Sequence, residues 1–158
     1  MDINSKNLKI DLGCGEKKQP GFIGIDIRPL KGVDIVYDLE EFPYPLPNEC
    51  ASIIVASHLV EHINPHKGVF INFMNEIWRL MEIGGEFIIS APYAGSHGFY
   101  QDPTHCNPLN EDTWKYFDPL DKSRLYQIYK PRPWKIKSNI WNINGNLKVT
   151  LIKRKINT

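Results

Sequence analysis

The sequence predicts a single α/β domain, residues 1–158, with a mostly parallel twisted sheet, helices on both faces and a C-terminal antiparallel hairpin. Three observations favour this fold class. Short apolar runs alternate with turn residues in the first half, an amphipathic helix pattern lies between two such runs, and two β-prone runs close the sequence. A strand, a helix and a strand at this spacing imply parallel strands joined by right-handed crossovers.

Four apolar runs in the first half have the length of buried strands. We expect strands over residues 8–12, 22–27, 34–37 and 52–57, with turn residues after the first three. The run 52–57 is almost wholly apolar, which is typical of a central strand covered on both faces. The proline-rich stretch 42–47 predicts a loop between the third and fourth strands.

The middle of the chain has one helix pattern followed by a strand pattern. From residue 67 to residue 81 the apolar side chains recur at three- and four-residue spacing, which predicts an amphipathic helix ended by Gly84-Gly85. A fifth strand is expected over 86–90, and Pro92 interrupts the β pattern after it.

The second half divides into a long loop and a hairpin. Residues 93–133 are crowded with glycine, proline, polar and aromatic residues, and they predict a loop with one short helix near 111–117. A loop of this length is usually functional. Residues 134–142 and 146–155 are β-prone, so we expect an antiparallel hairpin with its turn at 143–145.

Composition and charge exclude several classes of protein. Hydrophobic residues make up 42% of the chain and charged residues 23%, as in globular rather than disordered or fibrous proteins. The formal net charge of +1 gives no footprint for duplex nucleic acid, so no such partner is expected. The three cysteines lack a CxxC pair, which argues against a disulfide framework. The first residues lack the apolar run of a signal peptide or anchor, which predicts a cytoplasmic location without a membrane partner.

A glycine turn after the first predicted strand indicates a ligand site. Gly13 and Gly15 follow Asp11, and their missing side chains allow a ligand to approach the backbone closely. A dinucleotide fold would need a third glycine where Lys18 stands and an acid later than Asp26. The turn therefore argues against NAD or FAD.

Acidic residues follow three neighbouring predicted strands. Asp26 ends the second strand, where an ionised carboxylate can accept hydrogen bonds from both hydroxyls of a ribose. With Asp11 and Asp38 it places acids at the carboxyl ends of three strands, the edge at which open α/β sheets bind ligands. This arrangement fits a cationic sulfonium cofactor better than a phosphate.

Four segments occur in the order and spacing of a known family: IDLGCG, GFIGIDI, YDLEEFPYPLPNECASIIVASHLVEHI and MNEIWRLMEIGGEFIISAPY. On these segments, residues 8–93 resemble the class I S-adenosylmethionine-dependent methyltransferases of the type 11 group. The resemblance implies a Rossmann-like sheet, a cofactor-binding half over 1–92, and transfer of a methyl group from S-adenosylmethionine. It also implies that Asp26 holds the ribose and that Asp38 with Leu39 flanks the adenine.

The cofactor-binding residues implied by the resemblance lie at the ends of four strands. The glycine turn would line the methionine end, and Ser57, His58 and His62 would lie over the cofactor. The complete expected set is Asp11, Gly13, Cys14, Gly15, Asp26, Ile27, Asp38, Leu39, Ser57, His58 and His62. Only nine residues, 13–21, join the first two strands, whereas a parallel crossover normally needs about a dozen or more. We therefore expect a vestigial first helix.

Some of these residues also have structural interpretations. The glycine pair is compatible with an ordinary tight turn, and Asp11 with a carboxylate that only binds backbone amides. The segment from His58 to His62 matches the HxxEH pattern of one group of zinc proteases, but Pro65 leaves little helix to present the histidines. We expect instead that Glu61 or His62 hydrogen-bonds the loop above the cofactor.

The loop after residue 93 contains the candidates for catalysis. His97, Asp102 and His105 stand among aromatic residues, and a histidine is suited to take a proton from the acceptor near neutral pH. A metal cluster of these three residues with Cys106 lacks the spacing of a tetrahedral site, so no metal is predicted. Histidines that only pin the loop are the structural alternative.

The acceptor is expected to be a small molecule or a sugar-type compound bound by residues 93–133. The tetrapeptide from Ser90 to Tyr93 resembles one in DNA amino-methyltransferases, but a serine replaces its opening Asn or Asp, so base methylation is a secondary hypothesis. Two other classes stay open: a catalytically idle module that binds the cofactor or a partner, and a metal-dependent hydrolase. The residues indicate no oligomeric state.

Overall fold

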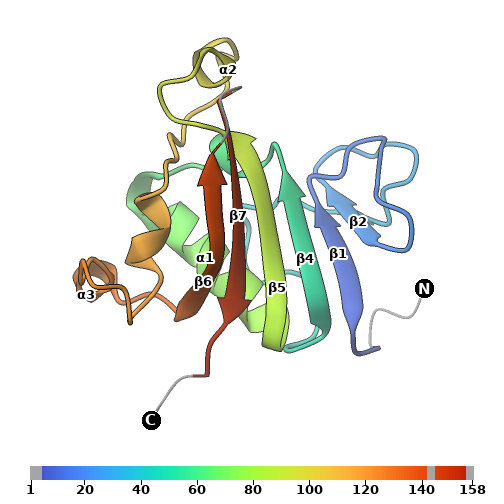
Figure 1. The fold of residues 1–158 in the computed structure, drawn as a ribbon. Helices are drawn as coiled ribbons and strands as arrows, with labels where there is room; N and C mark the ends of the chain where they lie inside the picture. Colours follow the sequence, from blue (N-terminus) through green and yellow to red (C-terminus); the bar gives the residue numbers. More distant parts are fainter. Residues whose placement is uncertain (1–4, 142–144, 156–158) are drawn as a thin grey trace.

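The computed structural model describes residues 5–141 and 145–155. Its centre is one seven-stranded sheet with the spatial order β3-β2-β1-β4-β5-β7-β6 (Figure 1). The first five strands in this order are parallel, and β7 runs antiparallel to both β5 and β6. The predicted sheet with its C-terminal antiparallel hairpin is confirmed. The strands are β1 Leu8–Leu12, β2 Ile23–Asp26, β3 Ile35–Val36, β4 Ala51–Ser57, β5 Met81–Pro92, β6 Trp134–Trp141 and β7 Asn146–Lys153.

The strand order reverses between β1 and β4. Ile10 of β1 pairs with Ile23 of β2 on one side and with Ile54 of β4 on the other. Open α/β sheets bind ligands in the crevice at such a switch point, outside the carboxyl ends of the strands. The fold therefore positions a candidate site beyond the ends of β1, β2 and β4.

The helix α1 (Val69–Leu80) provides the main helical contact with the sheet. Phe73 on its apolar face is fully buried, and its ring centroid lies 6.4 Å from that of Phe87 in β5. The Phe87 ring lies 6.0 Å from that of Trp134 in β6, which is also fully buried. Burying one phenylalanine side chain contributes about 1.5–3 kcal/mol. This row of rings joins α1 to the hairpin through the central sheet.

The helix ends earlier than the sequence predicts. It stops at Leu80 instead of at Gly84-Gly85, and β5 begins at the next residue, Met81. The register of β5 against β4 shifts in this region, so the glycine pair forms an irregularity inside the strand. A Cβ on Gly85 would lie 2.5 Å from the sulfur of Met81. Gly85 therefore allows a close approach within the sheet, and Gly84 supplies a positive φ beside it, so the pair does not mark a helix end.

The two faces of the sheet are covered differently, which departs from the expected helices on both faces. In Figure 1, α1 lies behind the sheet, and no other described helix has more than four residues. On the side of α1, Phe87 and Ile89 are fully buried, whereas Ile88 between them is only half-buried on the opposite side. Ile53 in β4 is also half-buried. The connections between β1, β2 and β3 are too short to bring helices onto this face.

The crossover from β1 to β2 contains no helix in residues 13–22, which confirms that the first helix is vestigial. The long connection 93–133 holds short helices. The helix expected near 111–117 is the 3-10 helix η3, Thr113–Tyr116. The predicted hairpin turn falls mostly on residues 142–144, outside the described residues. None of the helices described is long and apolar enough to cross a membrane. The short helices are η1 Val60–His62, η2 His66–Gly68, α2 His97–Tyr100, η3 Thr113–Tyr116 and α3 Tyr126–Tyr129.

Candidate functional site

A cavity of about 520 Å³ opens at the carboxyl ends of β1, β2 and β4, and we name it the switch-point cavity. Its lining includes seven of the eleven residues expected to bind a cofactor, together with four that the sequence analysis missed. Asp11, Cys14, Gly15 and Ser57 were also expected there but do not line it. The cavity is lined by Gly13, Asp26, Ile27, Arg28, Asp38, Leu39, Glu40, His58, Leu59, His62 and Ile63.

Gly13 forms the floor of the switch-point cavity where β1 ends. Its N–H donates to the carbonyl oxygen of Ile25 at 2.8 Å, and its φ of 63° lies in the left-handed region. A Cβ at this position would lie only 2.9 Å from Cδ1 of Leu59. Glycine is therefore required both by the turn and by the Leu59 side chain that packs directly against it.

Asp26 at the end of β2 is buried, and both of its carboxylate oxygens accept hydrogen bonds from neighbouring residues. One carboxylate oxygen accepts from the N–H of Gly15 at 2.9 Å, and the other accepts from the N–H of Arg28 at 2.9 Å and from its Nε at 3.2 Å. Burial alone would raise the pKa of Asp26, but the hydrogen bonds from Arg28 and Gly15 outweigh it and hold the pKa below its usual value. The carboxylate is therefore ionised at neutral pH.

The other acid of the glycine turn has a different contact. Asp11 is buried, and its carboxylate accepts from the N–H of Gln19 at 2.9 Å, which holds the short crossover against β1. Burial raises the pKa of Asp11 despite this bond. Asp38, in contrast, lines the switch-point cavity and accepts from the N–H of Glu40 at 2.9 Å. The contact of Asp11 therefore matches the structural interpretation, in which its carboxylate only binds a backbone amide.

The remaining expected residues lie beside the cavity. Cys14 and Gly15 line a separate cleft with Arg28, on the outer side of the glycine turn. A Cβ on Gly24 would lie 2.6 Å from the sulfur of Cys14, so this small buried side chain fills a tight place. Ser57 is exposed at the end of β4.

A second cavity of about 290 Å³, which we name the histidine cavity, adjoins the first. His58 and His62 line both cavities. Asp102 and His105 reach the histidine cavity from the long loop, but His97 is exposed on α2 and is not among the lining residues. The lining consists of His58, Glu61, His62, Pro92, Gly98, Gln101, Asp102, His105 and Asn146.

Glu61 is the most unusual group in the histidine cavity. Its side chain is fully buried, and neither carboxylate oxygen has a hydrogen-bond partner among the described residues. Nδ1 of His58 lies 3.3 Å from Oε1, and Nε2 of His105 lies 4.0 Å from it. Burial raises the pKa of Glu61, although its own main-chain N–H and, to a smaller extent, the nearby histidines oppose this.

The HxxEH segment holds the long loop through the main chain around Glu61 and, as the sequence analysis expected, through the side chain of His62, whose Nδ1 lies 3.1 Å from Oγ1 of Thr104. The carbonyl oxygen of Glu61 accepts from the N–H of Cys106 at 2.9 Å and from that of Asn107 at 3.0 Å. Nδ2 of Asn107 donates to the carbonyl oxygen of Val60 at 3.0 Å. The HxxEH pattern was the available signal for this cluster, but it gives no indication of which loop the motif meets.

Hydrogen bonds orient two of the histidines. Nδ1 of His105 lies 2.8 Å from the carbonyl oxygen of Phe99, which can only accept, so this nitrogen is the protonated one. Nδ1 of His62 lies 3.1 Å from Oγ1 of Thr104, and the same hydroxyl donates to Asp102 at 2.7 Å. The His62 and His105 ring centroids are 4.6 Å apart in an edge-to-face arrangement. The long loop thus brings His105 and Asp102 to the HxxEH segment but leaves His97 outside.

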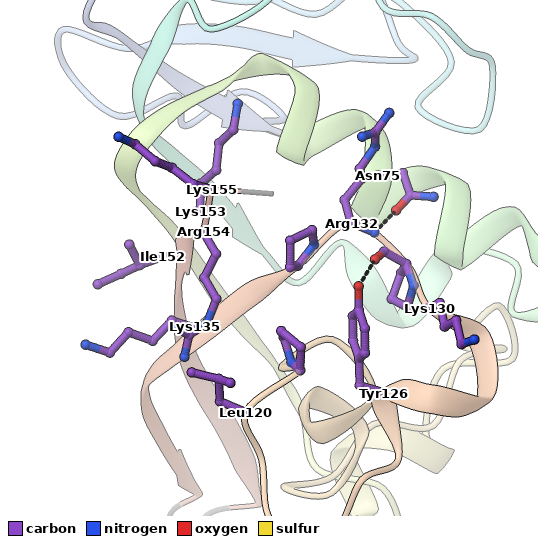
Figure 2. Close-up of a pocket in the computed structure, with 13 residues that line it drawn as sticks. Asn75, Leu120, Tyr126, Lys130, Arg132, Lys135, Ile152, Lys153, Arg154 and Lys155 are labelled. Carbon is purple, nitrogen blue, oxygen red and sulfur yellow. Dashed lines mark hydrogen bonds between the residues drawn. The ribbon is translucent and has the colours of Figure 1, made fainter. Parts of the chain in front are cut away.

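The largest cavity, of about 760 Å³, lies at the opposite edge of the sheet, between the start of β6 and the end of β7. Figure 2 shows its basic side chains, including Lys130, Arg132 and Lys135. Dashed lines in Figure 2 mark two hydrogen bonds between residues of the lining. The N–H of Arg132 donates to Asn75, and the hydroxyl of Tyr126 donates to a main-chain carbonyl. Residues within 119–133 of the loop expected to bind the acceptor contribute to it, but none of the expected cofactor-binding or catalytic residues does, so the candidate site is the pair of cavities at the switch point.

No protein-family model matches the sequence, and no curated protein matches it. An S-adenosylmethionine-dependent methyltransferase from Archaeoglobus fulgidus matches 96% of this chain and 88% of its own, at 18% identity and a TM-score of 0.65. Another from Mesorhizobium loti matches 97% of this chain and 94% of its own, at 12% identity and a TM-score of 0.57.

A third solved structure is a 16S rRNA (adenine(1408)-N(1))-methyltransferase from Catenulisporales acidiphilia with its cosubstrate S-adenosylmethionine. It matches 98% of this chain and 88% of its own, at 13% identity and a TM-score of 0.60. At these identities the likeness is one of fold. The strand order, the antiparallel β7 and these neighbours together show that the chain has the class I S-adenosylmethionine-dependent methyltransferase fold.

Proposed function

We propose that the protein is a methyltransferase that binds S-adenosylmethionine in the switch-point cavity and methylates an acceptor in the histidine cavity. The observation that carries the proposal is that the two cavities meet at His58 and His62, at the edge of the sheet where α/β folds bind ligands. Methyl transfer needs this proximity, because a direct displacement requires reacting atoms about 3–3.5 Å apart. The fold neighbours support the same class of reaction.

The residues of the switch-point cavity fit this cofactor. Gly13 allows the backbone of the turn to pack closely against Leu59, and a Cβ there would push the Leu59 side chain, which also lines the cavity, out of its place. Asp26 already accepts three hydrogen bonds, and a carboxylate has about four lone-pair sites. Binding both ribose hydroxyls would therefore displace the Nε contact of Arg28, whose side chain is 64% exposed and free to move outward. Asp38 and Leu39 would flank the adenine with one polar and one apolar side chain.

The histidine cavity would align the acceptor and handle its proton. Bound S-adenosylmethionine supplies an electrophilic methyl group on a sulfonium centre. Because Nδ1 of His105 is committed to the carbonyl of Phe99, its Nε2 presents a lone pair that can accept a proton from an acceptor hydroxyl. Asp102, with Oδ2 3.8 Å from that Nε2, would stabilise the protonated ring. An amine that is already neutral would need no base.

A small hydroxylated acceptor, such as a sugar-type compound, fits the histidine cavity best. Its volume of about 290 Å³ lies just below the usual range of ligand pockets, about 300–1,000 Å³, so only a small acceptor would fit. Most of the side chains in its lining are polar, so a compound with several hydroxyl groups would find hydrogen-bond partners there. A large apolar acceptor would not.

Calorimetric titration with S-adenosylmethionine and with its demethylated product tests the proposal. We expect both to bind, and Asp26→Asn to weaken both. Glu41→Gln is the matched control, because Glu41 is an exposed acid on the neighbouring loop that does not line the cavity. Transfer of a labelled methyl group to a panel of hydroxylated metabolites then tests turnover. Failure of either ligand to bind would contradict the proposal, and binding without transfer to any fraction of a cell extract would favour the idle module.

A further inference from the structure

We propose that Glu61, His62 and His105 bind one divalent transition-metal ion at the wall between the two cavities. One possible ligand atom from each residue lies within 4.8 Å of the other two. Nε2 of His105 is 4.0 Å from Oε1 of Glu61. Ligand atoms about 2.0–2.2 Å from a zinc ion are about 3–4 Å from one another. Small rotations of these side chains would therefore close the site around an ion.

The state of Glu61 is the independent indication of a ligand. Buried carboxylates in proteins are normally hydrogen-bonded, paired with a cation or coordinated to a metal, because desolvation of the charge is otherwise costly. Glu61 is fully buried and accepts no hydrogen bond from the described residues. The groups nearest to its Oε1 are ring nitrogens of His58 and His105. An ion bound by the carboxylate of Glu61 and by ring nitrogens of His62 and His105 would neutralise the buried charge.

Hydrogen bonds hold both proposed histidine ligands in the tautomer that coordination requires. The N–H at Nδ1 of His105 donates to the carbonyl oxygen of Phe99. The hydroxyl of Thr104 gives its proton to Asp102, so its oxygen accepts from the N–H at Nδ1 of His62. Nε2 of each ring is left with a lone pair. Metal-bound histidines typically donate their second N–H to a carbonyl or other acceptor in this way, which fixes the ring orientation.

The ligand set selects the class of ion. Two imidazole nitrogens with one carboxylate oxygen are typical of zinc, cobalt or iron(II) sites, whereas Mg²⁺ prefers oxygen ligands. All three residues line the histidine cavity, so a free coordination position would face the acceptor. A metal-bound hydroxyl has a lowered pKa, so such an ion would favour an acceptor whose nucleophile is an oxygen.

The use of the ion rests on the proposed methyl transfer, whereas metal binding itself does not. With His105 acting as a ligand, the acceptor hydroxyl would lose its proton to water. Its oxygen would form a bond to the methyl carbon, and the carbon–sulfur bond would break with its electron pair left on sulfur. Metal and cofactor binding can thus be measured separately.

The test is a titration of the chelator-treated full-length protein, without a histidine tag, with Co²⁺ and with Zn²⁺. Calorimetry gives the stoichiometry, and the visible absorption of Co²⁺ reports its ligands. We expect one ion per chain, with binding at least about 100-fold weaker in Glu61→Gln. Thr104→Val, which removes only the hydroxyl that orients His62, should weaken binding by about 10–100-fold. His66→Ala removes an exposed histidine outside the cluster and should bind as the wild type does.

Three results would overturn the metal site: no stoichiometric Co²⁺ or Zn²⁺ binding by the wild type, equal affinity in Glu61→Gln, or Mg²⁺ binding as tightly as Zn²⁺. If Glu61→Gln does not fold, an unchanged Co²⁺ affinity and spectrum in Thr104→Val would overturn it instead. The demethylated cofactor is titrated into the same metal-free samples. Cofactor binding without metal binding contradicts the metal site alone, and metal binding without cofactor binding contradicts the methyltransferase proposal alone.

Discussion

The two adjoining cavities differ in how their buried carboxylates are satisfied. Asp26 in the switch-point cavity accepts three hydrogen bonds from its own chain, and its pKa is lowered although burial opposes this. Glu61 in the histidine cavity has no such partner among the described residues, and burial raises its pKa. The carboxylate of Asp26 is thus satisfied by the chain itself, whereas that of Glu61 keeps the binding capacity that the proposed metal ion would use. Substitutions in the switch-point cavity and substitutions in the histidine cavity should therefore have separable effects on cofactor binding and on methyl transfer.

Gly13→Val should have the largest effect, confined to the switch-point cavity. Valine would need a left-handed φ and would place its Cβ against Leu59, so we expect cofactor affinity to fall at least about 100-fold, or about 2.7 kcal/mol. Gly21→Ala is the control, because Gly21 also has a positive φ, but a Cβ there meets nothing within 4 Å. Calorimetry on both variants measures the difference, and equal affinities would contradict the assignment of Gly13 to the cavity floor.

His105→Ala should affect the histidine cavity and not the switch-point cavity. Methyl transfer should fall by about 100-fold or more, the range of a lost general base, and the same loss is expected if the imidazole holds a metal ion. Affinity for S-adenosylmethionine should change less than about two-fold, since His105 does not line the switch-point cavity. Melting temperature, affinity and transfer rate are measured on one preparation. Parallel loss of stability and affinity would show that His105 only pins the loop.

Asp26→Asn should weaken cofactor binding by about 10–100-fold, because hydrogen bonds to a charged group contribute about 1.5–3 kcal/mol each. The structure adds a cost in stability, since the same carboxylate joins Gly15 to Arg28. Asn keeps the size of the side chain, so a folded variant is expected in thermal denaturation. Unchanged affinity in a folded variant would place the ribose elsewhere.

The smallest effect should be the contribution of Asp26 to the pH dependence of the protein's stability. Its pKa in the folded protein lies below the unfolded value of about 3.9, so its contribution to stability is present above about pH 4 and is lost as the pH falls through the folded value. The difference in unfolding free energy between wild type and Asp26→Asn should be constant from about pH 7 to 5 and shrink below about pH 4. Urea denaturation across this range measures it. A constant difference down to about pH 3 would argue against an ionised, hydrogen-bonded Asp26.

Much of the sheet and of the switch-point cavity could be predicted because their signals are local. β1 occupies the predicted residues 8–12, and Gly13 and Asp26 reach the cavity because each directly follows or ends a strand. Strand ends in a parallel sheet share one edge, so positions along the sequence translate into positions in space. Asp11 is the exception, because its side chain points to the crossover amide of Gln19.

The histidine cavity could not be predicted in the same way because it depends on a contact distant in the sequence. Cys106 and Asn107 bind the carbonyl of Glu61 more than 40 positions earlier, and no periodicity or motif shows this pairing. The sequence analysis consequently treated the histidines of the loop and those of the HxxEH segment as two separate groups. It also missed Arg28, whose exposed side chain binds Asp26 only because the chain turns sharply after β2.

The attachment of the long loop to the HxxEH segment has a consequence for how the binding of one ligand would affect the binding of the other. The main-chain bonds from Cys106 and Asn107 to Glu61 tie the loop to residues whose neighbour, His62, lines both cavities. An acceptor that displaced the loop would therefore also move part of the wall of the switch-point cavity. In that case the binding of the acceptor and the binding of the cofactor would be thermodynamically linked, and each ligand would change the affinity of the other by the same factor.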